Sequence, residues 1–110
     1  MAASKQLPDK TRALLDDLWQ RNLPVVEARL AVLDRAAQAD PLPEELRLDA
    51  ISVAHKLAGS LGMFGFAEGT RISRQLELAL DLPVADSAQL TQLAQQLREE
   101  LFPAPPASTP

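Results

Sequence analysis

The single histidine, His55, is the residue of this chain best suited to carry chemistry. An imidazole changes its charge near neutral pH, so part of it is a neutral nucleophile at that pH. All four glycines of the chain follow it, at positions 59, 62, 65 and 69. Gly59 and Gly62 come four and seven residues after His55, which places them beside the ring on one helix face. Because a glycine inside a helix costs about 1 kcal/mol relative to alanine, this pattern indicates space cleared for a partner.

The composition excludes several kinds of site. With no cysteine and one histidine, the chain offers no disulfide scaffold, no thiolate zinc site and no multi-histidine metal site. Its 15 acidic and 11 basic residues give a net charge of −4, so neither nucleic acid nor an anionic membrane is an expected partner. Residues 1–10 lack the apolar core of a signal peptide and no apolar run is long enough to span a bilayer. We therefore expect a cytoplasmic location.

Prolines divide the chain into five predicted helices, because proline fits the first turn of a helix and breaks its interior. The predicted helices run from about Asp9 to Arg21, Pro24 to Ala39, Pro43 to Met63, Phe66 to Leu80 and Ser87 to Phe102. Short connections between such helices favour antiparallel neighbours. We expect an all-α fold, an antiparallel up-and-down four-helix bundle with an additional short N-terminal helix that caps one end through Leu18 and Trp19. Residues 1–102 would form one domain, and the Pro-rich residues 103–110 a disordered tail.

The predicted helix over 43–63 has a core seam and an unusual outer face. The seam comprises Leu46, Ala50, Val53, Leu57 and Leu61. His55 lies nearly opposite this seam, so we expect its side chain in solvent. Its neighbours on the outer face are small or apolar where charged residues are usual, and they are Leu48, Ile51, Ser52, Ala58, Gly59 and Gly62. We interpret this face as a docking surface. Two glycines have ordinary alternatives, since Gly65 or Gly62 can end the helix and Gly59 can serve helix packing.

Residues 54–65, Ala-His-Lys-Leu-Ala-Gly-Ser-Leu-Gly-Met-Phe-Gly, resemble the central motif of histidine-containing phosphotransfer (Hpt) domains. In that motif an apolar residue stands two positions after the histidine, glycine four, a small residue five and glycine ten positions after it. Here those places hold Leu57, Gly59, Ser60 and Gly65. Members of the family are four-helix bundles with a shorter N-terminal helix, so the resemblance extends over nearly the whole chain.

The resemblance implies that His55 is phosphorylated and exchanges the phosphoryl group with aspartates on receiver domains of response regulators or hybrid histidine kinases. The chain would then be a monomeric phosphoryl carrier without kinase activity. It would need no cofactor, because Mg²⁺ is expected on the receiver. Many relatives have lysine three positions after the histidine, where this chain has Ala58, so Lys56 is a candidate for that charge. Glu77, 22 positions after His55, would orient the ring. The supporting residues implied are Lys56, Gly59, Ser60 and Glu77.

Two other interpretations stay open. The chain could be a non-catalytic adaptor that binds a receiver domain, or a partner helix, through the apolar outer face. Receiver binding without phosphoryl transfer would favour the adaptor. Glu77 could also be a solvated residue paired with Arg74 or Arg71 on the surface.

Overall fold

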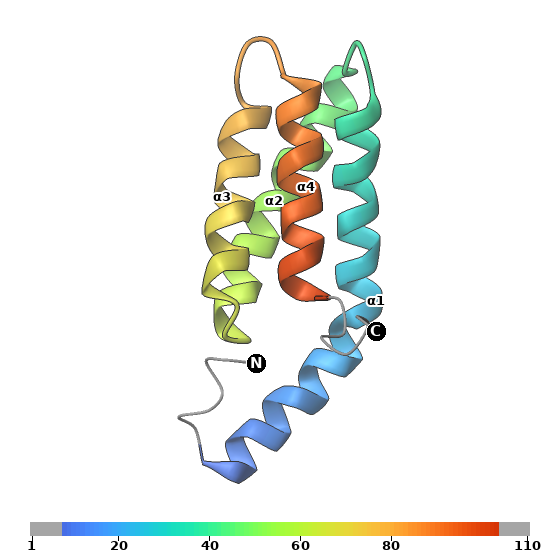
Figure 1. The fold of residues 1–110 in the computed structure, drawn as a ribbon. Helices are drawn as coiled ribbons and strands as arrows, with labels where there is room; N and C mark the ends of the chain where they lie inside the picture. The colour runs from blue at the N-terminus through green and yellow to red at the C-terminus, as the bar shows by residue number, and fades with distance from the viewer. Residues whose placement is uncertain (1–7, 104–110) are drawn as a thin grey trace, which may run out of the picture.

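The computed structural model describes residues 8–103, which contain four helices and no strand. The helices are α1 (Asp9–Gln38), α2 (Glu44–Met63), α3 (Ala67–Leu80) and α4 (Ser87–Leu101). They pack in a ring, in which α2 contacts α3, α3 contacts α4, and α1 contacts both α2 and α4. The connections 39–43 and 81–86 lie at one end of the molecule and 64–66 at the other (Figure 1). The expected all-helical fold is confirmed for this part of the chain. The expected disordered tail lies, from residue 104 on, outside the described residues.

The predicted break between the first two helices is wrong. Helix α1 is continuous from Asp9 to Gln38 and contains Pro24 in its interior. Proline removes one backbone hydrogen bond and crowds the preceding turn, which can bend a helix without ending it. Figure 1 shows the N-terminal part of α1 running at an angle to the rest of the helix. The expected additional N-terminal helix is therefore the first part of α1.

Aromatic packing explains why this first part of α1 stays attached to the bundle. The Trp19 ring lies 5.3 Å from that of Phe64 and 4.8 Å from that of Phe66, measured between centroids. A third ring, Phe102, lies 6.5 Å away. Trp19 is buried, which confirms its predicted contact with the end of the bundle, whereas Leu18 is 41% exposed and lines a hollow beside Phe64. Tilted aromatic pairs at these distances add to the free energy gained by burial.

The core seam of α2 is confirmed at its centre. Ala50, Leu57 and Leu61 are fully buried, while Leu46 and Val53 are half-buried at its edge. The apolar seam expected for α4 is buried throughout, at Leu90, Leu93, Leu97 and Leu101. Since these aliphatic side chains face one another in the middle of the ring, burial of apolar surface holds the four helices together. None of the helices within residues 8–103 has the length and apolar character needed to cross a membrane.

Gly65 sets the turn between α2 and α3. Its φ is +88°, a conformation that favours glycine, and its N–H donates to the carbonyl of Gly62 at 3.2 Å. The N–H of Phe66 donates to the carbonyl of Leu61 at 3.0 Å. These two bonds form a Schellman motif, so the expectation that Gly65 ends the helix is confirmed. A Cβ at Gly69 would lie 3.1 Å from Leu61 Cδ1, so this glycine lets α3 pack closely on α2.

Candidate functional site

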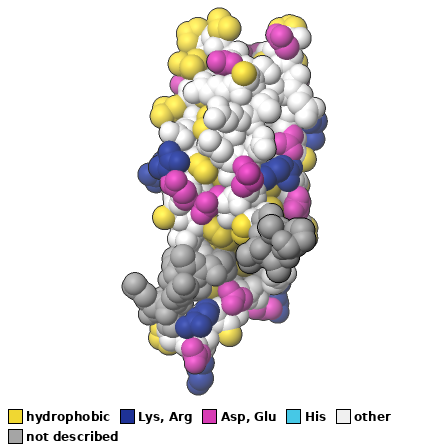
Figure 2. Space-filling view, viewed as in Figure 1, with side chains coloured by type: hydrophobic (Ala, Val, Ile, Leu, Met, Phe, Trp, Pro, Cys, Tyr) yellow, Lys and Arg dark blue, Asp and Glu magenta, His cyan; other side chains and the backbone are white. Residues whose placement is uncertain are grey.

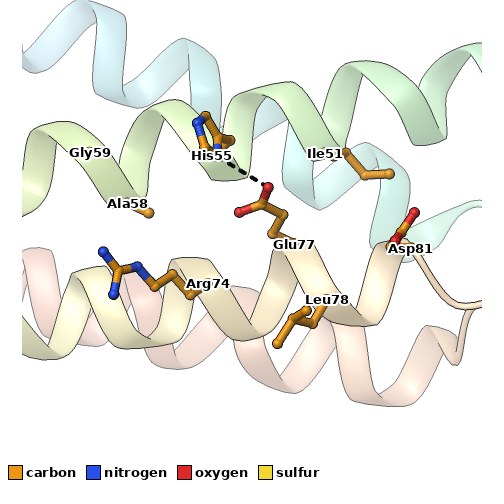
Figure 3. Close-up of a pocket in the computed structure, with 8 residues that line it drawn as sticks. All are labelled: Ile51, His55, Ala58, Gly59, Arg74, Glu77, Leu78 and Asp81. Atoms are coloured by element: carbon orange, nitrogen blue, oxygen red, sulfur yellow. Dashed lines mark hydrogen bonds and ion pairs between the residues drawn. The ribbon is translucent and has the colours of Figure 1, made fainter.

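His55 lies in the middle of α2, with its side chain 75% exposed as predicted. Its Nδ1 lies 3.2 Å from Oε2 of Glu77 in α3 (Figure 3). The Glu77 side chain is 31% exposed, so Glu77 is the more buried member of the pair. The contact that the sequence analysis expects between the two residues is therefore present in the fold.

The position of the carboxylate determines which ring nitrogen can act as a nucleophile. An ionised carboxylate only accepts hydrogen bonds, so the contact with Glu77 favours the form of His55 that carries a hydrogen on Nδ1. In the neutral ring Nε2 then keeps its lone pair. Figure 3 shows the His55 ring on α2, with the dashed contact running to the Glu77 carboxylate on α3. The arrangement therefore favours one tautomer of an exposed ring, the one in which Nε2 can act as the nucleophile.

A surface depression of about 540 Å³ surrounds this pair. Its lining residues come from α2, α3 and the residue that follows α3, and they are Ile51, His55, Ala58, Gly59, Arg74, Glu77, Leu78 and Asp81. The position of a Cβ on Gly59 has no neighbouring atom within 4 Å, so the space over this glycine is open. Leu78 is 69% exposed and adds an apolar rim on the α3 side. The depression can therefore admit a group bound to His55, and a partner that covers it.

The predicted docking residues divide into two groups. Ile51, Ala58 and Gly59 line the depression, whereas the exposed residues Leu48, Ser52 and Gly62 do not. Ala58 is only 7% exposed, so its predicted place on the outer face is wrong. The reason is that α3 packs against this part of α2, where the Thr70 hydroxyl donates to the Ala58 carbonyl at 3.3 Å.

Two of the predicted supporting residues lie away from the depression. Lys56 is exposed on α2 but does not line it, since one residue along a helix turns the side chain by about 100°. Ser60 is half-buried, and its hydroxyl donates to the Leu57 carbonyl at 3.5 Å. It lines a separate hollow beside α1. The functional roles implied for Lys56 and Ser60 stay predictions.

Sequence reasoning assigned no place at the site to three lining residues, Arg74, Leu78 and Asp81. Arg74 and Asp81 stand three residues before and four after Glu77, which are the spacings of one helix face. Placing Glu77 beside His55 could therefore have found both. Leu78 follows Glu77 directly, and only its high exposure beside the histidine reveals it.

The arginines around the site differ in their pairing. Arg71 binds Glu68 through two hydrogen bonds, and this hydrogen bonding holds the pKa of the Glu68 carboxyl below its usual value. Arg47 donates to the Leu80 carbonyl at 3.0 Å and lies 3.7 Å from Asp81. The alternative pairing of Glu77 with Arg74 or Arg71 is absent among the described residues. Glu77 is directed at the imidazole instead.

Comparison with known proteins identifies the family of this chain. The Hpt domain family matches residues 12–101. The chain belongs to the Hpt domain family. It is also 38% identical to Protein RcaC of Microchaete diplosiphon over 68 residues, which are 59% of this chain and 10% of that protein. The chain therefore corresponds to a small part of this curated relative. No solved structure matches significantly. An Hpt domain is a phosphotransfer module of two-component signalling, and such domains are phosphoryl carriers.

Proposed function

We propose that this Hpt domain carries a phosphoryl group on Nε2 of His55 and exchanges it with aspartates of receiver domains. The observation that supports this most directly is the contact between Nδ1 of His55 and Glu77, which in the neutral ring favours a free lone pair on Nε2, in a side chain that is 75% exposed. An antiparallel up-and-down bundle would supply the rigid frame for this pair. The cytoplasmic location stays a prediction.

The transfer step forms one bond and breaks one. The Nε2 lone pair attacks phosphorus in the receiver's aspartyl phosphate, and the bond between phosphorus and the aspartyl oxygen breaks with its electron pair left on the carboxylate. The phosphorylated ring keeps its hydrogen on Nδ1 and becomes cationic, with Glu77 facing the new charge. Transfer back to an aspartate reverses each change.

The Hpt domain contributes position more than acid–base chemistry. Phosphoryl transfer passes through a loose and strongly anionic transition state, so orientation and charge stabilisation dominate its rate. Glu77 holds the ring and its tautomer, and we propose that the receiver supplies the Mg²⁺. The receiver would dock over the depression, where Ile51, Gly59 and Leu78 supply apolar or small groups.

A transfer assay tests the proposed function. A receiver carrying labelled phosphate is mixed with the protein and with His55→Gln, which removes the nucleophile from an exposed position without disturbing the core. The expected result is a label on the wild type that is labile in acid and stable in base, and none on His55→Gln. Phosphorus NMR should assign the adduct to Nε2. An equally labelled His55→Gln, or an adduct at Nδ1, would contradict the proposal.

The adaptor interpretation uses the same surface and gives different results. Exposed Leu48 and Leu78, at 54% and 69%, are the apolar groups that favour it. An adaptor would bind a receiver with no transfer over long incubation. If the partner is a helix, Leu48→Glu should abolish its binding and His55→Ala should leave its binding intact. Rapid labelling of His55 excludes both as the whole function.

A further inference from the structure

The depression around His55 holds two carboxylates and one permanent cation among its described lining residues. Glu77 and Asp81 are the acids and Arg74 is the cation. A phosphoryl group on Nε2 would bring further negative charge beside Glu77. Unless a cation meets that charge, the depression opposes the phosphorylated state. Arg74 is therefore the residue to examine.

Arg74 is free of the ion pairs that hold neighbouring arginines. Arg71, one turn earlier in α3, is bound to Glu68, and Arg47 is bound to Glu44. Arg74 makes no hydrogen bond or ion pair with any residue that the structure describes. Glu77, three residues later in α3, is at the right spacing for an ion pair with Arg74, but its carboxylate contacts His55 instead. The guanidinium thus keeps its full donor capacity for another anion.

The side chain of Arg74 lines the same depression as the His55 ring. Figure 3 shows Arg74 extending from α3 toward Ala58 and Gly59, one turn after His55 on α2. Nothing fills the space over Gly59, and Ala58 contributes only a methyl group at the floor. Lys56 does not line this space. The imidazole and the guanidinium therefore share one depression, with open space over Gly59.

We propose that Arg74 binds the phosphoryl oxygens while the group is on Nε2 of His55 and during its transfer. The guanidinium would donate hydrogen bonds to two oxygens at once, the geometry that suits arginine better than lysine. Arg74 stays charged throughout and exchanges no proton. The proposal rests on phosphorylation of His55, and it assigns to Arg74 the phosphate-facing charge for which Lys56 is the candidate from sequence.

The first test needs no receiver, so its outcome does not depend on the proposed function. Phosphoramidate phosphorylates the protein chemically, with ammonia as the leaving group, and phosphorus NMR follows the titration of the phosphoryl group with pH. Because Arg74 favours the dianion, the phosphoryl pKa should rise by about half a unit in Arg74→Gln. Arg74→Lys should restore part of the difference. A purely structural role would leave this titration unchanged.

Arg71→Gln is the matched control, since it removes the same charge from the same helix one turn away from the depression. It should titrate as the wild type does. If Arg74→Gln fails to fold, Arg74→Met keeps the aliphatic stem and allows the same comparison. Identical titrations for the Arg74 and Arg71 variants would overturn the proposal.

The second test measures transfer from a phosphorylated receiver. Water is displaced in the docked complex, so loss of the guanidinium should slow transfer about tenfold in Arg74→Gln. Arg71→Gln should retain the wild-type rate. Normal labelling of His55 with normal transfer in Arg74→Gln would refute the role of Arg74 and leave the carrier function standing. If a phosphorylated receiver transfers no label to the wild-type protein, the carrier function is refuted, while the first test still decides the role of Arg74.

Discussion

Nδ1 of His55 and Oε2 of Glu77 lie 3.2 Å apart, although the two residues are 22 positions apart and belong to different helices. The close packing of α3 on α2 brings them together, through the turn at Gly65 and the missing side chain of Gly69. The pair is stronger evidence for function than either residue alone, because it selects one tautomer of an exposed ring.

Glu77→Gln should slow phosphoryl transfer by about twofold to tenfold, since the amide can accept the Nδ1 hydrogen bond but carries no charge to balance the phosphorylated ring. Glu77→Ala should slow phosphoryl transfer further, because the ring also loses its orientation. Nitrogen NMR of the neutral ring should show hydrogen on Nδ1 in the wild type and an increased share on Nε2 in Glu77→Ala. If the tautomer is unchanged in Glu77→Ala, Glu77 does not orient the ring.

Gly59→Ala should stabilise the protein by up to about 1 kcal/mol, because alanine is the better helix former and no atom obstructs its methyl group. Gly59→Gln should keep the fold but slow transfer from a receiver about tenfold or more, since its side chain fills space the receiver needs. Thermal unfolding and the transfer assay measure the two effects. Gly69→Ala is the contrasting variant, and it should be destabilised by contacts at 3.1 and 3.3 Å. Unfolding of Gly59→Ala would assign Gly59 to packing.

Leu78→Glu should weaken receiver binding about tenfold or more, because a partner over the depression would bury this leucine. The fold should be unaffected, since 69% of the side chain is already exposed. Leu14→Glu is the matched control, a 58% exposed leucine in the N-terminal part of α1. Titration calorimetry with a receiver gives the comparison. Equal affinities for the two variants would place the docking surface elsewhere.

Gly65→Ala should destabilise the protein by about 1 to 2 kcal/mol, because its φ of +88° is costly for a residue with a side chain. The loss should appear in denaturant unfolding. Gly59→Ala, the same substitution within a regular helix, should move stability in the opposite direction. A neutral Gly65→Ala would show that the turn can rearrange without cost.

Local features of the fold were predictable from the sequence. The exposure of His55 and the burial of Leu57 follow from helical periodicity, and the helix end at Gly65 follows from the preference for glycine just after a helix. Pro24 misled the prediction because its local preference competes with a tertiary contact. The Trp19 rings hold the first part of α1 against the bundle, so the helix continues through the proline.

The sequence by itself determined the histidine motif and the helices that carry it, because these depend on residues within a few turns of one another. Only the tertiary structure decided what surrounds the ring. It directs Glu77 to Nδ1, leaves Arg74 unpaired beside the open space over Gly59, and buries Ala58 under α3. Each of these depends on the rotation and separation of α2 and α3, which side-chain packing between the two helices sets.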